Sequence, residues 1–83
     1  MPLFLDSHTI PAGTSTVQLE EIHARDVAVQ DKHGVRYLKW WYDPARGRVM
    51  CLVLAPSREA AMAVHREAND ITPDDIFEVQ EFE

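Results

Sequence analysis

The sequence predicts an α+β fold in which two helices cover one face of a four-stranded antiparallel sheet. Three observations lead to this prediction. Two apolar runs flank a turn sequence near the middle of the chain, which indicates a β-hairpin. A segment with helical spacing stands on each side of this hairpin. A short strand-like run then lies towards each end of the chain.

The first of these strands and the first helix precede the hairpin. Residues Pro2–His8 form the expected strand, and a proline and a glycine follow it. Ser15 and Gln18 then fit a capping box, in which each residue binds the backbone N–H of the other. A helix is therefore expected over Val17–Lys32. Gly34 stands where a glycine commonly ends a helix.

The hairpin comes next and organises the fold. Its two runs, Val35–Tyr42 and Val49–Leu54, are rich in Val, Tyr, Trp and Leu, which suit a packed sheet. Between them Asp43 can bind its own backbone and Pro44 presets φ. Gly47 can adopt the positive φ that a bulged hairpin loop needs. These features predict one antiparallel pair of strands.

The side chains of the hairpin predict that both of its faces are covered. Strict alternation would divide the first run between the faces, with Val35, Tyr37, Lys39 and Trp41 on one and Arg36, Leu38, Trp40 and Tyr42 on the other. Neither set is polar throughout, whereas a hairpin with one wet face should alternate more cleanly. We therefore expect the helices on one face and a second copy of the chain on the other.

The second helix and the last strand complete the order. Ser57 is the expected N-cap of a helix that runs to about Asn69, where Asn69-Asp70 can supply a left-handed stop. The last strand is expected over Ile76–Phe82. The resulting β-α-β-β-α-β order is the ferredoxin-like arrangement, here as a single domain over residues 1–83. Right-handed connections would place the first and third strands at the centre of the sheet. We expect two chains to pair in an assembly of the dimeric α/β-barrel type.

Composition and charge exclude several classes of function. The net charge is −6, and the basic residues are scattered over Arg25–Arg66, which disfavours nucleic-acid binding. No apolar run has membrane-spanning length, and the opening MPLFLD lacks the features of a signal peptide. We therefore expect a cytoplasmic protein. The single Cys51 cannot form an internal disulfide, and we interpret it as a small core residue.

Ionisable side chains stand on faces that should be buried. His23 and Asp26 fall within the apolar stripe of the first helix, and His65 falls within that of the second. Asp6 and His8 share one face of the first strand. If that face looks towards the helices, all five side chains could converge. If it looks away, Asp6 and His8 belong to the dimer side, and the sequence alone allows both arrangements.

A converging set of this kind predicts a metal site. Paired histidines are common in ordinary cores, but buried ionisable groups are costly unless they are paired or bind a metal. Imidazole and carboxylate ligands suit nickel, zinc, copper or ferrous iron. No phosphate loop, nucleophile elbow or His-Glu-x-x-His motif accompanies them, so we expect binding without catalysis.

Two other functions are open. The sheet face of a dimer could enclose a small-molecule cavity with a histidine as base, as in cofactor-independent monooxygenases of the dimeric α/β-barrel type. The residues that could line it are Tyr37, Trp40, Trp41, Tyr42 and Met50. The chain could also be a structural interaction module whose histidines only pack, because one scaffold supports many functions.

Several segments resemble a known family. The segment YLKWWYDPARGRVMCLVLAPSREAAMAVHREAND is similar to the small ferredoxin-like nickel-binding proteins, otherwise catalogued as a domain of unknown function, and so are MPLFLDSH and HARDVAVQDKHGVRYL. The resemblance implies a homodimer that binds nickel or a similar divalent ion, with His8, His23 and His65 as matching positions. The chain departs from it at Leu54 and Asn69, where relatives often carry Glu and His.

Overall fold

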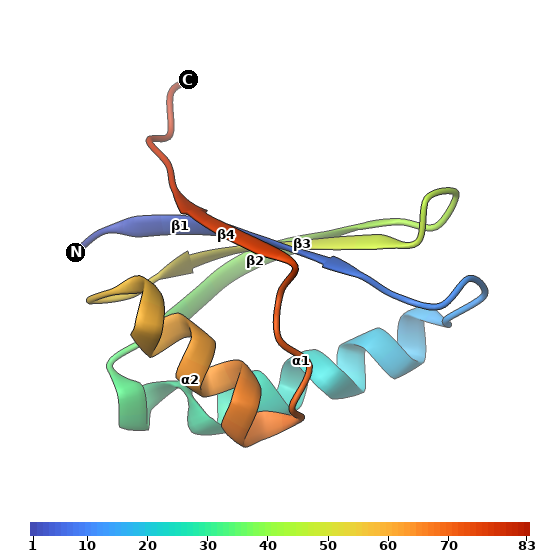
Figure 1. Ribbon diagram of the computed structural model, residues 1–83, viewed down its shortest axis with the longest axis horizontal. Coiled ribbons are helices and arrows are strands. Elements are labelled where there is room, and N and C mark those ends of the chain that lie inside the picture. Colours follow the sequence, from blue (N-terminus) through green and yellow to red (C-terminus); the bar gives the residue numbers. More distant parts are fainter.

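The computed structural model describes all residues, 1–83, and confirms the predicted fold class (Figure 1). The elements follow the order β1 (Leu3–Thr9), α1 (Thr16–Gln30), the 3₁₀ turn η1 (Asp31–His33), β2 (Arg36–Asp43), β3 (Arg48–Leu54), α2 (Arg58–Ala68) and β4 (Asp75–Glu78). The strands form one antiparallel sheet in the order β2-β3-β1-β4, with the first and third strands central. Both helices lie on the same side of this sheet.

The helix boundaries follow from local capping. The predicted capping box is present, because Gln18 N donates to Ser15 Oγ at 3.1 Å and Ser15 N donates to Gln18 Oε1 at 2.9 Å. Helix α1 ends at Gln30, two residues before the predicted end, and η1 continues it to Gly34, which has φ 69°. Ser57 caps α2 as expected, since its Oγ accepts from Ala60 N at 3.1 Å.

The last strand is shorter than predicted. Strand β4 ends at Glu78 rather than at Phe82. Its partner β1 begins at Leu3, whose carbonyl accepts from Val79 N at 2.9 Å, so the residues that follow have no strand left to pair with. Figure 1 shows this tail leaving the sheet on the side away from the helices, and Phe82 is 83% exposed.

A bulge in β2 changes the faces of its side chains. Tyr37 pairs with Val53 but Lys39 pairs with Leu52, so Leu38 is an extra residue between them. The strict alternation predicted for this strand is therefore wrong beyond Tyr37. Trp40 lies opposite Cys51, on the same face as Tyr37. The sets on the two faces of the strand are Tyr37, Trp40 and Tyr42 towards the helices, and Lys39 and Trp41 away from them.

The core lies between the helices and the sheet. It is formed by inward residues of the central strands together with small and branched residues of the helices, such as Phe4, Val53, Leu19, Ala61 and Val64. Few large side chains are available for a core of this size, so polar groups occupy part of the same layer. Asp6, Asp26 and His65 are all at most 3% exposed.

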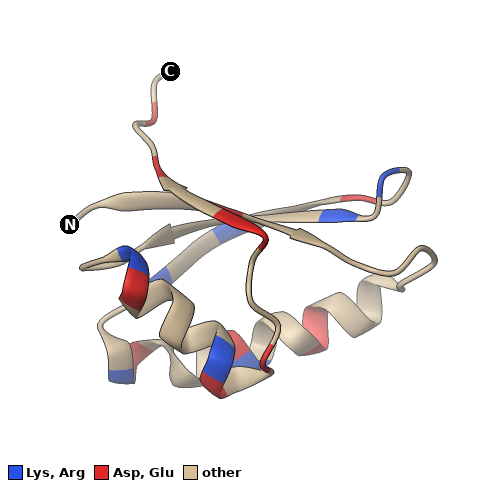
Figure 2. Ribbon diagram, viewed as in Figure 1, with Lys and Arg blue, Asp and Glu red and all other residues tan.

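The opposite face of the sheet has no covering element. Trp41 and Phe77 are each 45% exposed there, and Leu38 at the bulge is also exposed. Figure 2 shows the Lys and Arg residues distributed among α2, the sheet and the hairpin loop rather than gathered on one element. Neither helix has the length and apolar character needed to cross a membrane.

Candidate metal centre

Strand β1 turns Asp6 and His8 towards the helices. Asp6 lies opposite Cys51 on one neighbouring strand and Ile76 on the other, and both of these partners belong to the core. Asp6 is 0% exposed and His8 is 6% exposed. Of the two arrangements that the sequence allows, the fold therefore has the one in which Asp6 and His8 approach the histidines and carboxylate of the helices.

Asp6 holds two imidazoles at once. Its Oδ1 lies 3.1 Å from Nε2 of His8, and its Oδ2 lies 2.9 Å from Nε2 of His65. Burial alone would raise the pKa of Asp6, but the hydrogen bonds from His65 and His8 outweigh it and hold that pKa below its usual value. The carboxylate is therefore ionised. Since it can only accept, both Nε2 atoms must carry a hydrogen.

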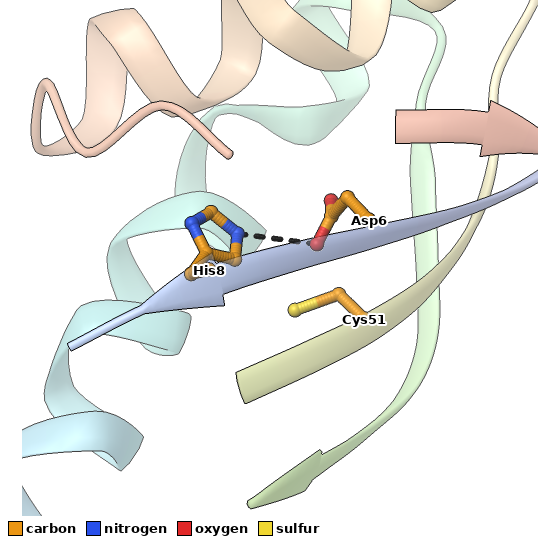
Figure 3. A group of neighbouring side chains, drawn as sticks. All are labelled: Asp6, His8 and Cys51. Carbon is orange, nitrogen blue, oxygen red and sulfur yellow. Dashed lines mark hydrogen bonds and ion pairs between the residues drawn. The ribbon is translucent and has the colours of Figure 1, made fainter. Parts of the chain in front are cut away.

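His8 has one nitrogen without a partner. Its Nε2 is committed to Asp6, while its buried Nδ1 makes no hydrogen bond in the chain. Figure 3 shows this second nitrogen on the side of the ring away from the carboxylate. In the neutral ring it is an acceptor with a free lone pair. A buried polar atom without a partner in the chain is uncommon and costs free energy, so this nitrogen is a candidate ligand atom.

His65 lies between two carboxylates. Besides its contact with Asp6, its Nδ1 lies 3.3 Å from Oδ1 of Asp26, and its Nε2 lies 2.9 Å from the hydroxyl of Tyr37. Burial lowers the pKa of His65, but Asp26 and Asp6 outweigh this effect and raise the pKa to about 9. The ring is therefore a buried imidazolium at neutral pH. It joins the two carboxylates and offers no free lone pair.

His23 is the imidazole that has no hydrogen bond. It projects from α1 with its ring centroid 5.8 Å from those of Tyr37 and Trp40. The histidine hydrogen bonds of the chain involve His8, His33 and His65, so both nitrogens of His23 are unpaired. Burial lowers its pKa against the attraction of Asp26. His23 is thus neutral at pH 7, which is the form that binds metals.

Asp26 receives both of its contacts through one oxygen. Oδ1 accepts from Nδ2 of Asn69 at 3.2 Å and lies 3.3 Å from Nδ1 of His65. His65 lies in the last turn of α2 and Asn69 is its C-cap, so the carboxylate links α1 to the C-terminal end of α2. No side chain contacts Oδ2 at hydrogen-bond distance. This second oxygen remains available to a ligand in the cavity that Asp26 lines.

These groups border one small cavity between the helices and the sheet. Its volume is about 40 Å³, and its polar lining consists of His8, His23, Asp26, His65 and Asn69, with Trp40 and Cys51 among the remaining wall residues. A buried water needs roughly 10–15 Å³ by this measure, so about three waters fit. Small-molecule sites usually have roughly 300–1,000 Å³. The cavity is therefore smaller than most sites for organic substrates, and seven of its twelve lining residues are hydrophobic.

Cys51 belongs to this centre, although the sequence suggested only a core role for it. One donor atom from each of Asp6, His8 and Cys51 lies within 4.8 Å of the others (Figure 3). Burial, and then the charge of Asp6, raise the pKa of the thiol, so it stays protonated. Only the register that places Cys51 opposite Asp6 brings it here, and no sequence motif indicated that register.

Of the ten predicted site residues, the five proposed for a metal lie together and the five proposed for a small molecule do not. The cavity is lined by His8, His23, His65 and Asp26, and Asp6 stands behind it in contact with two of them. The five residues suggested for a small-molecule cavity do not share one space: Trp40 lines the metal-sized cavity, Tyr37 contacts His65, Tyr42 donates to the carbonyl of Thr14, and Trp41 pairs with Met50 on the uncovered face. Adjacent residues of a strand face opposite sides, which separates Trp41 from Trp40, and the bulge in β2 places Tyr37 on the face of Trp40.

Comparison with known proteins then gives the family. The model of the SCO4226-like nickel responsive proteins matches residues 4–79. The chain belongs to this family. A crystal structure of SCO4226 from Streptomyces coelicolor A3(2) is similar to it over 98% of this chain and 99% of that chain, with 36% sequence identity and a TM-score of 0.91. No curated protein matches the sequence.

Proposed function

We propose that the protein binds a divalent transition metal ion, nickel in the first instance, in the cavity between the helices and the sheet. The unpartnered Nδ1 of buried His8 is the observation that carries this proposal. The ring of His8 lines a mostly apolar cavity that is large enough for an ion and a little water. Membership of a family described as nickel responsive supports the choice of metal.

The donors that we assign to the ion are His8 Nδ1, His23 and Asp26. Two imidazole nitrogens and a carboxylate oxygen form a set that suits nickel and its neighbours in the first transition row. Their donor atoms come from β1 and α1, so the ion would tie the sheet to the first helix. The donor atoms that already lie within 4.8 Å of one another are those of Asp6, His8 and Cys51, so binding by the assigned set requires movement, for which His23 is free because it has no hydrogen bond.

Asp6 and His65 support this set. Asp6 accepts from Nε2 of His8, which fixes the ring orientation and leaves Nδ1 for the metal, a common arrangement around metal-bound histidines. The single positive charge of His65 offsets part of the charge of Asp6 and Asp26, and its ring bridges the two carboxylates. Cys51 is the nearest additional donor, and its coordination would release the thiol proton.

Isothermal titration calorimetry with Ni²⁺ tests the site. We expect one site per chain in the wild type and no measurable site in His8→Ala or His23→Ala. His33→Ala is the matched control, because His33 contacts Glu67 on the surface and does not line the cavity. Equal heats in all four proteins, or no binding to the wild type, would exclude the proposed site. Mg²⁺ should give no heat, because it prefers oxygen ligands.

The uncovered sheet face supports a homodimer as the form of the protein. A second copy placed face to face would bury Trp41 and Phe77, which are otherwise unusually exposed for aromatic residues of a sheet. Light scattering should give twice the chain mass for the wild type and the monomer mass for Trp41→Glu. Val17→Glu, on the exposed surface of α1, should remain dimeric. A monomeric wild type would contradict the dimer and leave the metal site untouched.

A further inference from the structure

Asn69 makes a contact that the metal set does not account for. Its Nδ2 donates to Oδ1 of Asp26 at 3.2 Å. Asn69 is the C-cap of α2, four residues after His65, and the side chains of both residues reach the same oxygen. Asp26 is thereby held from one helix and through one atom. Its other oxygen is the one that is free to face the cavity.

The amide of Asn69 is also fixed at its other end. Its Oδ1 accepts from the backbone N–H of Ile71 at 2.9 Å. Between them Asp70 has φ 58°, the left-handed conformation that ends α2. Rotation of the Asn69 side chain would therefore break one hydrogen bond or the other. The side chain of Asn69 thus connects the segment 69–71 to Asp26 through hydrogen bonds. Both Asn69 and Ile71 border the cavity.

We propose that Asn69 is a positioning residue of the metal site, which holds Oδ1 of Asp26 so that Oδ2 points at the ion. This inference rests on the proposed function. Asn69 is not itself a ligand, because its nitrogen donates to Asp26 and its oxygen accepts from Ile71. The opposite role would be competition with the ion, in which the amide of Asn69 occupies Asp26. The two roles predict changes of opposite sign in affinity.

Calorimetry with Ni²⁺ on Asn69→Ala distinguishes these roles. Loss of a residue that orients a ligand typically weakens metal binding 10–100-fold, and we expect a loss in that range. Ser57→Ala is the control for helix stability, because Ser57 caps the opposite end of α2 and should leave the affinity unchanged. The urea midpoint of metal-free Asn69→Ala should fall no further than that of Ser57→Ala, so that a loss of affinity in Asn69→Ala alone reports on the site.

Each other result overturns the inference in a recognisable way. Tighter binding by Asn69→Ala would show that the amide competes with the ion. Unchanged affinity would show that it has no part in the site. An equal loss of affinity in Ser57→Ala would indicate a general effect on the fold. Absence of nickel binding by the wild type would instead remove the proposed function, whatever the variants do.

Discussion

Oδ2 of Asp6 lies 2.9 Å from Nε2 of His65, although 59 positions separate the two residues in the chain. This contact joins the central strand β1 to α2 across the core. A second carboxylate, Asp26, approaches the other nitrogen of the same ring from α1. Three elements thus meet at one buried imidazolium. The same contacts shape the cavity wall, so stability and the proposed metal site depend on the same side chains.

Asp6→Ala should therefore destabilise the protein strongly. The change would leave His65 with one carboxylate and would remove the acceptor of His8 Nε2. Breaking a buried ion pair by removing one partner costs roughly 3–5 kcal/mol, and we expect a loss of that size in the free energy of unfolding from urea titration. Lys32→Ala breaks an exposed pair with Glu67 and should cost about 1 kcal/mol or less. Similar losses in the two variants would refute the role given to Asp6.

The stability of the metal-free protein should fall as the pH rises from neutrality. The pKa of His65 is raised from 6.5 to about 9 on folding, against burial and because of Asp26 and Asp6. Its stabilising contribution is thus fully present below pH 6.5 and is lost as the pH rises through 9. Linkage gives a loss on the order of 3 kcal/mol for this group.

Urea titrations at several pH values between 6 and 9 would measure this loss. His65→Gln removes the titrating ring and should show a smaller decrease over the same interval, although it is less stable at pH 6. A wild-type free energy of unfolding that stays constant from pH 6 to 9 would show that His65 is not charged in the folded protein.

Nickel should stabilise the folded chain. A ligand that binds only the folded state at about 100 times its dissociation constant adds about 2.7 kcal/mol to the free energy of unfolding. Thermal unfolding with and without Ni²⁺ would show this as a higher Tm, and a chelator should reverse the shift. His8→Ala should show no shift, because it lacks the unpartnered nitrogen. An equal shift in this variant would place the metal elsewhere on the chain.

Gly47→Ala should disturb the loop that closes the hairpin next to β1. Gly47 has φ 66°, and a Cβ there would lie 2.8 Å from the carbonyl oxygen of Ile10. The backbone N–H of Ile10 also donates to Gly47 O at 2.8 Å, so the two segments cannot separate freely. We expect a loss of more than about 1 kcal/mol from strain and collision together.

Gly13→Ala is the matched comparison for this substitution. Gly13 has φ 83° but nothing within 4 Å of an added Cβ, so only backbone strain applies. The difference in free energy of unfolding between the two variants therefore measures the collision with Ile10. Equal losses would mean that the hairpin loop moves away from β1 at little cost.

The fold could be predicted from the sequence because each element carries its own local signals. Ser15, Ser57 and Gly34 marked helix ends that the structure confirms to within a few residues. The bulge at Leu38 could not be predicted, since one extra residue leaves no compositional trace. The end of β4 depends on where its partner β1 begins, which is a property of pairing and not of residues 79–83.

For the candidate site, the sequence predicted the residues but not their arrangement in space. The convergence of His8, His23, His65 and the two carboxylates depended on the face of β1, which the sequence left open. Periodicity also could not tell which imidazole is charged, because the charge of His65 comes from residues on two other elements. Cys51 carried no signal, because its role arises from strand register. Asn69 stood out only as a helix stop and as a departure from its relatives, and its contact with Asp26 arises from the turn that ends α2.

The extra residue in β2 has a consequence for how relatives of this chain should be aligned. Because Tyr37 and Trp40 face the same way across Leu38, a shortened strand that lacks Leu38 would alternate regularly and still turn Trp40 and Tyr42 inward. Deleting Trp41 instead would reverse Tyr42 and Asp43. A single-residue gap between family members therefore belongs at position 38, where loss or gain of one residue leaves Trp40 and Tyr42 facing the helices.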